Sequence, residues 1–268
     1  MKPSRSAALV AACRMLAAEL PEHERLIDDP FARLVVDDEA IAAARADVAL
    51  QNVIRLRTRY IDDAVQAFAG THVAQQPQVL LLGAGLDARA FRMNLQIDFY
   101  EVDFAATLEL KSVLLAGHSP RSSRTLVPVD LATGSFVTPL IAAGFDPKRP
   151  TIVVWEGVIN YLSAETAESV VAQIAEVVAP GGQIVADYVE MEWFKGTQLE
   201  RSTQTIAKNL QDGGEPLRSG LPDARGTLAQ AGFEVIDDEA IELLPPRYGL
   251  PAATRVYPAK ILTATRRN

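Results

Sequence analysis

Three acidic residues stand at the ends of apolar runs that the sequence predicts to be β-strands. Asp103, Asp130 and Glu156 each close such a run, and the carboxyl ends of neighbouring parallel strands meet at one edge of a sheet, where ligands bind. These acids either cap polar strand ends or form a site for a cation and for ribose hydroxyl groups. The site is favoured, because three carboxylates would otherwise crowd negative charge around one crevice.

A glycine-rich turn follows the apolar run at residues 79–82. Gly83 and Gly85 allow the chain to turn sharply and to approach a ligand closely. Residues 83–88 match the GxGxxA form of the dinucleotide fingerprint, so NAD is one candidate ligand. Asp87 disfavours a phosphate in this turn, because a carboxylate repels an anion. S-adenosylmethionine, which is cationic and carries no phosphate, therefore fits better.

Arg57 lies in a predicted helix, within the segment RLRTRYIDD at residues 55–63. Charges of both signs at this spacing are typical of a solvated, salt-bridged helix face. The carboxylate of S-adenosylmethionine needs a cation, however, and Arg57 is the residue that the N-terminal helices offer for it.

Alternating strands and helices from residue 78 onward predict an α/β fold with a doubly wound, mostly parallel sheet. Strands are expected at residues 79–82, 98–103, 125–130, 151–156, 183–189, 232–236 and 259–265. Helices are expected at residues 4–20, 31–36, 46–69, 104–116, 163–178 and 227–231. We expect an N-terminal helical cap at residues 1–75, a sheet domain at residues 76–268, and a lid inserted at residues 190–222.

Composition narrows the class of partner. The chain has 268 residues and a formal net charge of −8, from 26 basic and 34 acidic residues, which gives no basic footprint for nucleic acid. The single cysteine, Cys13, is expected in the core, and no cluster has the spacing of a metal site. No apolar run reaches the ~20 residues that span a bilayer, and a cytoplasmic location is expected.

Five motifs occur in order along the chain: RTRYIDDAV at 57–65, VLLLGAGLDARAF at 79–91, YEVDF at 100–104, VDL at 129–131 and EGVINYL at 156–162. Together with DPFA at 29–32, they resemble the leucine carboxyl methyltransferase family over nearly the whole chain. The resemblance implies a Rossmann-like, seven-stranded class I fold that binds S-adenosylmethionine and releases S-adenosylhomocysteine.

The resemblance also implies a role for each matched residue. The expected cofactor-binding residues are Arg57 at the donor's carboxylate, Gly83 and Gly85 along its methionyl part, Asp103 at the ribose, Asp130 and Leu131 at the adenine, and Glu156 near the amino group. Asp87 either contacts the ligand or pairs with Arg89 to brace the turn. Tyr161 either lies near the transferred methyl group, as the one catalytic candidate, or packs in the core.

The expected reaction is O-methylation of a small-molecule carboxylic acid of natural-product type, in secondary metabolism. A carboxylate is ionised at neutral pH and needs no general base. Candidate docking residues for it are Arg201, Arg218, Arg247, Tyr248 and Arg255. The alternatives are methylation of a hydroxyl group or of a protein C-terminal carboxylate, an NAD-dependent oxidoreductase, and a donor-binding protein repurposed to another reaction. We expect no nucleic-acid or membrane partner, and a monomer or homodimer.

Overall fold

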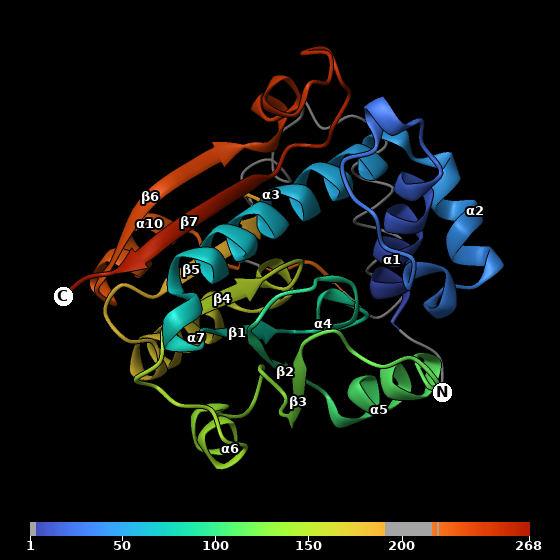
Figure 1. Cartoon of the computed structure of the whole chain (residues 1–268). Helices are drawn as coiled ribbons and strands as arrows, with labels where there is room; N and C mark the ends of the chain where they lie inside the picture. Colours follow the sequence, from blue (N-terminus) through green and yellow to red (C-terminus); the bar gives the residue numbers. More distant parts are fainter. Residues whose placement is uncertain (1–3, 191–215, 219) are drawn as a thin grey trace.

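A single sheet organises the computed structural model, which describes residues 4–190, 216–218 and 220–268 (Figure 1). In this part of the chain the sheet has seven strands in the order β3-β2-β1-β4-β5-β7-β6, and β7 is antiparallel to both of its neighbours. The strands are β1 (Gln78–Leu82), β2 (Asp98–Asp103), β3 (Ser123–Pro128), β4 (Thr151–Trp155), β5 (Gln183–Tyr188), β6 (Phe233–Ala240) and β7 (Lys260–Arg266). The predicted seven-stranded, mostly parallel α/β fold is confirmed.

The order of the strands places a switch point at the end of β1. The chain steps from β1 outward to β2 and β3, and then returns to the other side of β1 to form β4 and β5. Doubly wound sheets bind ligands in the crevice outside the carboxyl ends of the strands at such a point. The glycine turn at residues 83–85 therefore lies at the place where sheets of this topology bind ligands.

Three helices precede the sheet: α1 (Arg5–Ala18), α2 (Asp38–Ala46) and α3 (Val48–His72). The prediction of a helix at residues 31–36 is wrong, because this segment forms only a short 3-10 helix, Ala32–Val35, at which Asp29 accepts the N–H groups of Phe31 and Ala32. The sequence analysis missed α2. Asp47 ends α2 and also caps α3 by accepting the N–H of Leu50, so two helices adjoin without a loop.

Shorter helices connect the strands: α4 (Arg89–Arg92), α5 (Ala105–Leu114), α6 (Val137–Ala142), α7 (Ala164–Val177) and α10 (Ala224–Gln230). Ser163 caps α7, as its sequence predicts, by accepting the N–H of Thr166. The sequence analysis missed α4 and α6, which have four and six residues and are too short to show a helical period.

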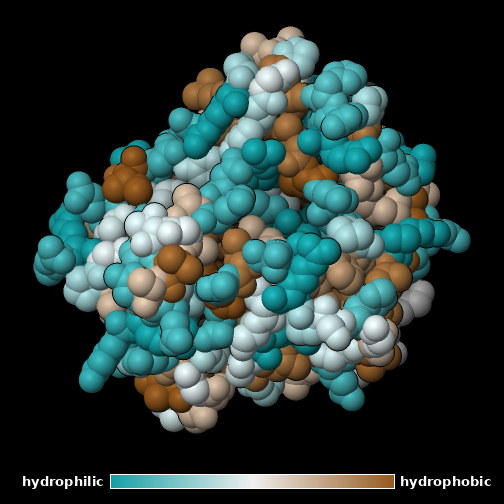
Figure 2. All heavy atoms as spheres, viewed as in Figure 1, coloured by the Kyte–Doolittle hydropathy of each residue, from teal (hydrophilic) through white to brown (hydrophobic). Residues whose placement is uncertain are grey.

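The sheet has a hydrophobic core on each face. The long helix α3 crosses one face, where Leu56, Ile61 and Val65 pack against the sheet (Figure 1). Helix α7 packs on the other face through Val170 and Ile174. The outer surface seen from the α3 side is mostly hydrophilic, with small hydrophobic areas between the charged side chains (Figure 2). Within the described residues, no helix is both long and apolar enough to cross a membrane.

A buried ionic triad joins β2, β3 and α5 next to the glycine turn. Glu101 and Lys111 are fully buried, with their charged atoms 2.9 Å apart, and Arg124 lies 2.8 Å from the same carboxylate oxygen. Lys111 Nζ also donates to the carbonyl of Ala84 at 3.4 Å. The triad thus fixes α5 to the sheet and supports the turn that follows β1.

We expect Lys111→Met to lower the free energy of unfolding by about 3–5 kcal/mol, because it removes half of the compensation of a buried carboxylate. Urea unfolding followed by circular dichroism measures the change. The exposed Lys148 provides a matched control, and Lys148→Met is expected to change the stability by less than about 0.5 kcal/mol. A Lys111→Met protein as stable as the wild type would contradict the structural role of the triad.

Candidate functional site

The turn after β1 requires glycine at two positions. Gly83 has φ +67°, and a Cβ there would collide with the side chain of Val158. Gly85 has φ +42°, and its N–H donates to Asp103 Oδ2 at 2.7 Å. The turn is therefore tied directly to the acid that ends β2.

Asp103 is the last residue of β2, and Asp130 lies two residues beyond the end of the neighbouring strand β3. Asp103 also accepts the N–H of Phe104, and its own backbone carbonyl accepts the N–H of Val129 at 2.9 Å. Burial raises the pKa of Asp103, although the hydrogen bonds that its carboxylate accepts from the N–H groups of Gly85 and Phe104 oppose the shift. Asp130 accepts from the N–H of Ala132 and from the Thr133 hydroxyl group, which shapes the loop after β3. Leu131, next to it, is buried.

Arg57 is buried, and it joins α3 to the ends of two strands. Its Nε donates to Glu156 Oε1 at 3.0 Å and its Nη1 to Asp187 Oδ2 at 2.8 Å. The solvated helix face that the sequence suggested is found instead at Arg59, which is half-exposed and pairs with Asp63 four residues later. The arginine-rich segment therefore combines an exposed ion pair with a buried one.

Arg89 gathers acids from three elements. It pairs with Asp87, donates to Glu156 Oε2 at 2.7 Å and donates to Asp62 on α3, also at 2.7 Å. Burial alone would raise the pKa of Glu156, but the charges of Arg89 and Arg57 outweigh it and hold the pKa well below its usual range. The contact between Asp87 and Arg89 is the brace that the sequence analysis kept as one of two roles for Asp87.

Asp187, the residue before the last one of β5, was not predicted from the sequence. Asp187 is buried and accepts the N–H of Gly157 at 2.6 Å in addition to the Arg57 bond. Burial raises the pKa of Asp187, and Arg57 offsets only part of that shift. The rule that selected an acid at the end of each apolar run passes over Asp187, because Tyr188 and Val189 follow it in the predicted strand.

One edge of the Arg57 guanidinium is left for a ligand. Nε and Nη1 are bonded to the two acids, whereas Nη2 makes no hydrogen bond within the described chain. Gly157, at φ +70°, passes so close that a Cβ there would come within 3.4 Å of Nη2. A donor carboxylate fits this arrangement, because Nη2 offers it an unused N–H on a cation. Gly157, which has no side chain, leaves room beside that N–H.

The predicted docking residues do not gather at one place. Arg247 lies 3.6 Å from Glu239 on β6 and stacks on Tyr60, and Tyr248 lies beneath the guanidinium of Arg59. Arg218 donates its backbone N–H to the carbonyl of Asn160, which brings it beside Tyr161. Arg255 is exposed, and its carbonyl accepts from Asn52. Arg201 and most of the expected lid lie outside the described residues.

The chain is similar in sequence to known methyltransferases. The family model described as leucine carboxyl methyltransferase matches residues 7–175. A candidate S-adenosyl-L-methionine-dependent methyltransferase from Mycobacteroides abscessus is 32% identical over 89% of this chain and 85% of its own length. Another from Mycolicibacterium gilvum is 30% identical over 77% of this chain and 74% of its own.

A solved structure shares the fold. A protein from Thermobifida fusca, described as a candidate methyltransferase, superposes with a TM-score of 0.65 over 100% of this chain and 96% of its own. The two sequences are 16% identical, so this likeness concerns the fold alone.

We expect Glu156 to stabilise the fold in a pH-dependent way. Because the folded protein holds its pKa below that of the unfolded chain, ~4.3, the stabilisation is complete above that value and is lost as the pH falls toward the folded-state pKa. Glu156→Gln should lower the free energy of unfolding by about 3–5 kcal/mol at pH 7. The difference from the wild type should shrink at pH 3.5.

Urea unfolding at both pH values measures this difference. The exposed Glu234 on β6 is the matched control, and Glu234→Gln should leave the stability nearly unchanged at either pH. A difference for Glu156→Gln that stays constant from pH 7 to pH 3.5 would argue against an ionised Glu156 held between two arginines.

Proposed function

Because the chain belongs to the leucine carboxyl methyltransferase family and is an S-adenosylmethionine-dependent methyltransferase, we propose that it methylates the carboxylate of a small-molecule acid. Membership in this family also excludes the alternative of an NAD-dependent oxidoreductase. The observation that carries the proposal is the absence, among the described residues, of a histidine base at the carboxyl edge of the sheet. The three histidines lie elsewhere: His23 lines an outer cavity, His72 ends α3, and His118 packs on Phe31.

Three of the acids at this edge are already paired with arginines. Glu156 accepts from two arginines, Asp187 from Arg57, and Asp87 from Arg89. An acceptor hydroxyl group would need a base within hydrogen-bond reach to take its proton. A carboxylate acceptor has a pKa of ~4 and arrives ionised, so the site needs only to bind and align it.

We assign the donor to the crevice between the glycine turn and the ends of β2 and β4. Arg57 Nη2 would bind its carboxylate, Asp103 its ribose hydroxyl groups, and Glu156 its amino group, while Asp130 and Leu131 would face the adenine. The bound donor supplies an activated methyl group. The protein's own contribution is to hold the two reactants in line, which can supply ~7–11 kcal/mol of the barrier.

The buried acids also suit a cationic ligand. Asp103 has a raised pKa because burial disfavours its charge, so hydrogen bonds from ribose hydroxyl groups would stabilise its ionised form. Glu156, whose pKa is lowered, stays ionised at neutral pH and can accept from an ammonium group. Both features support donor binding at this edge.

The proposal is tested with methyl-labelled donor and three sets of acceptors: aliphatic and aromatic carboxylic acids, the matching alcohols and phenols, and a peptide that ends in leucine. We expect label on small acids, released as methanol by mild base because esters hydrolyse. The rate should stay flat from pH 6 to pH 9, because the acceptor is ionised throughout.

Base-stable label on phenols, with a rate that rises with pH, would instead identify a hydroxyl acceptor. Label on the peptide alone would identify a protein tail. Asp103→Ala should weaken the binding of S-adenosylhomocysteine at least tenfold in calorimetry, and the exposed Asp38→Ala, distant in α2, should not.

A further inference from the structure

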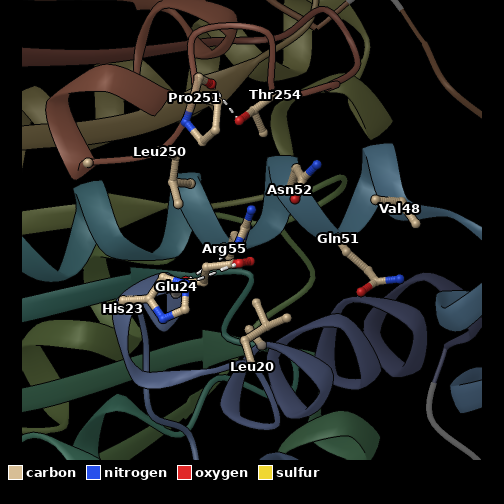
Figure 3. Close-up of a pocket in the computed structure, with 12 residues that line it drawn as sticks. Leu20, His23, Glu24, Val48, Gln51, Asn52, Arg55, Leu250, Pro251 and Thr254 are labelled. Carbon is tan, nitrogen blue, oxygen red and sulfur yellow. Dashed lines mark hydrogen bonds and ion pairs between the residues drawn. The ribbon is translucent and has the colours of Figure 1, made fainter.

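A second cavity lies on the outer side of α3. Its volume is about 670 Å³, and its walls come from the end of α1, the following 3-10 helix Glu22–Glu24, the first two turns of α3 and the segment before β7. Figure 3 shows α3 between two groups of lining residues, with Leu250 and Pro251 on one side and Leu20 on the other. This volume falls in the range of small-molecule sites, ~300–1,000 Å³.

The cavity is separate from the donor crevice. Arg55 lines it, and Arg57 reaches the acids at the strand ends, yet both come from α3. Side chains two residues apart on a helix point in nearly opposite directions, about 160° apart. A ligand at Arg55 would therefore lie behind the helix that carries Arg57, outside the crevice in which the donor is placed.

Arg55 is buried and incompletely paired. Only 7% of it is exposed, and its one hydrogen bond within the described residues runs from Nη1 to the backbone carbonyl of Glu24 at 3.2 Å (Figure 3). In the same part of the chain, the buried Nε has no hydrogen-bond partner and Nη2 makes no hydrogen bond. Burial lowers the pKa of Arg55, and the charge of Glu24 offsets only part of the shift. The Nε–Nη2 edge of a guanidinium is the edge that holds a carboxylate with two parallel bonds.

The other walls indicate what accompanies the anion. Leu20, Val48 and Leu250 give an apolar surface, whereas the amide nitrogens of Gln51 and Asn52 are bonded to backbone carbonyls. Glu24 is half-exposed at the rim, where solvent screens its charge. The wall therefore combines these apolar side chains with one buried cation, which suits a molecule with a hydrocarbon body and one acidic group.

We propose that this cavity binds a small amphipathic organic carboxylate, with its acid at Arg55 and its hydrocarbon chain between Leu20 and Leu250. The ligand completes the hydrogen bonds of a buried guanidinium that the described residues leave unmet. This binding is additional to methyl transfer and does not depend on which acceptor the enzyme uses.

Sodium octanoate serves as the probe. It is titrated by calorimetry into the full chain saturated with S-adenosylhomocysteine, so that the donor site is occupied. We expect saturable binding at one site and at least tenfold weaker binding of octanamide, which keeps the chain but lacks the charge. Equal binding of acid and amide would overturn the assignment.

Variants then locate the site. Arg55→Gln should weaken octanoate binding at least tenfold, whereas Arg33→Gln, at an exposed arginine, should leave it unchanged. Val48 lies at the exposed rim, so Val48→Trp should block the cavity while Arg55 stays unchanged. This second variant tests the location of the site even if Arg55→Gln folds poorly. Glu24→Gln should strengthen binding severalfold. Octanoate affinity that is unaffected by both Arg55→Gln and Val48→Trp would place the ligand elsewhere and refute the proposal.

Discussion

The burial of Arg57 is the constraint on which the rest of this structure depends. A guanidinium inside a protein has to be matched by acids and by hydrogen bonds. Glu156 and Asp187 supply both, and they do so from the ends of β4 and β5. Arg89 then shares Glu156 with Arg57 and extends the cluster to Asp87 and Asp62. One set of ion pairs thus fixes α3, the turn after β1 and two strand ends relative to one another.

Most groups of this ionic cluster hold the structure together, and only a few remain to contact a ligand. The apolar cores on the two faces of the sheet hold the strands, and the ionic cluster holds the polar edge where those strands end. The groups proposed to meet the donor are then the parts of the cluster that remain unused, above all Nη2 of Arg57. Pre-organised groups of this kind need little rearrangement when a charged ligand arrives. The same helix carries Arg55 on its opposite side, where no carboxylate of the described residues forms an ion pair with it.

Local sequence patterns predicted the parts of the fold that local interactions decide. Apolar runs located the strands, and the run that ends at Asp103 matched β2 at both ends. The burial of Arg57 could not be predicted in this way, because its partners lie 99 and 130 residues further along the chain. The same limit hid Asp187, whose role appears only when β5 is placed beside β4. Helix α2 was missed for a different reason: Asp47 serves two helices at once, and no glycine or proline marks the boundary.

The central claim is that Arg57, held by Glu156 and Asp187, binds the carboxylate of the donor. A double-mutant cycle tests it most directly, with wild-type protein and Arg57→Gln each titrated with S-adenosylhomocysteine and with an analogue that lacks only the carboxylate. We expect a coupling free energy of about 1.5–3 kcal/mol, because once the Arg57 guanidinium or the ligand's carboxylate has been removed, removing the other has no further effect on binding. Additive effects, with a coupling near zero, would contradict it.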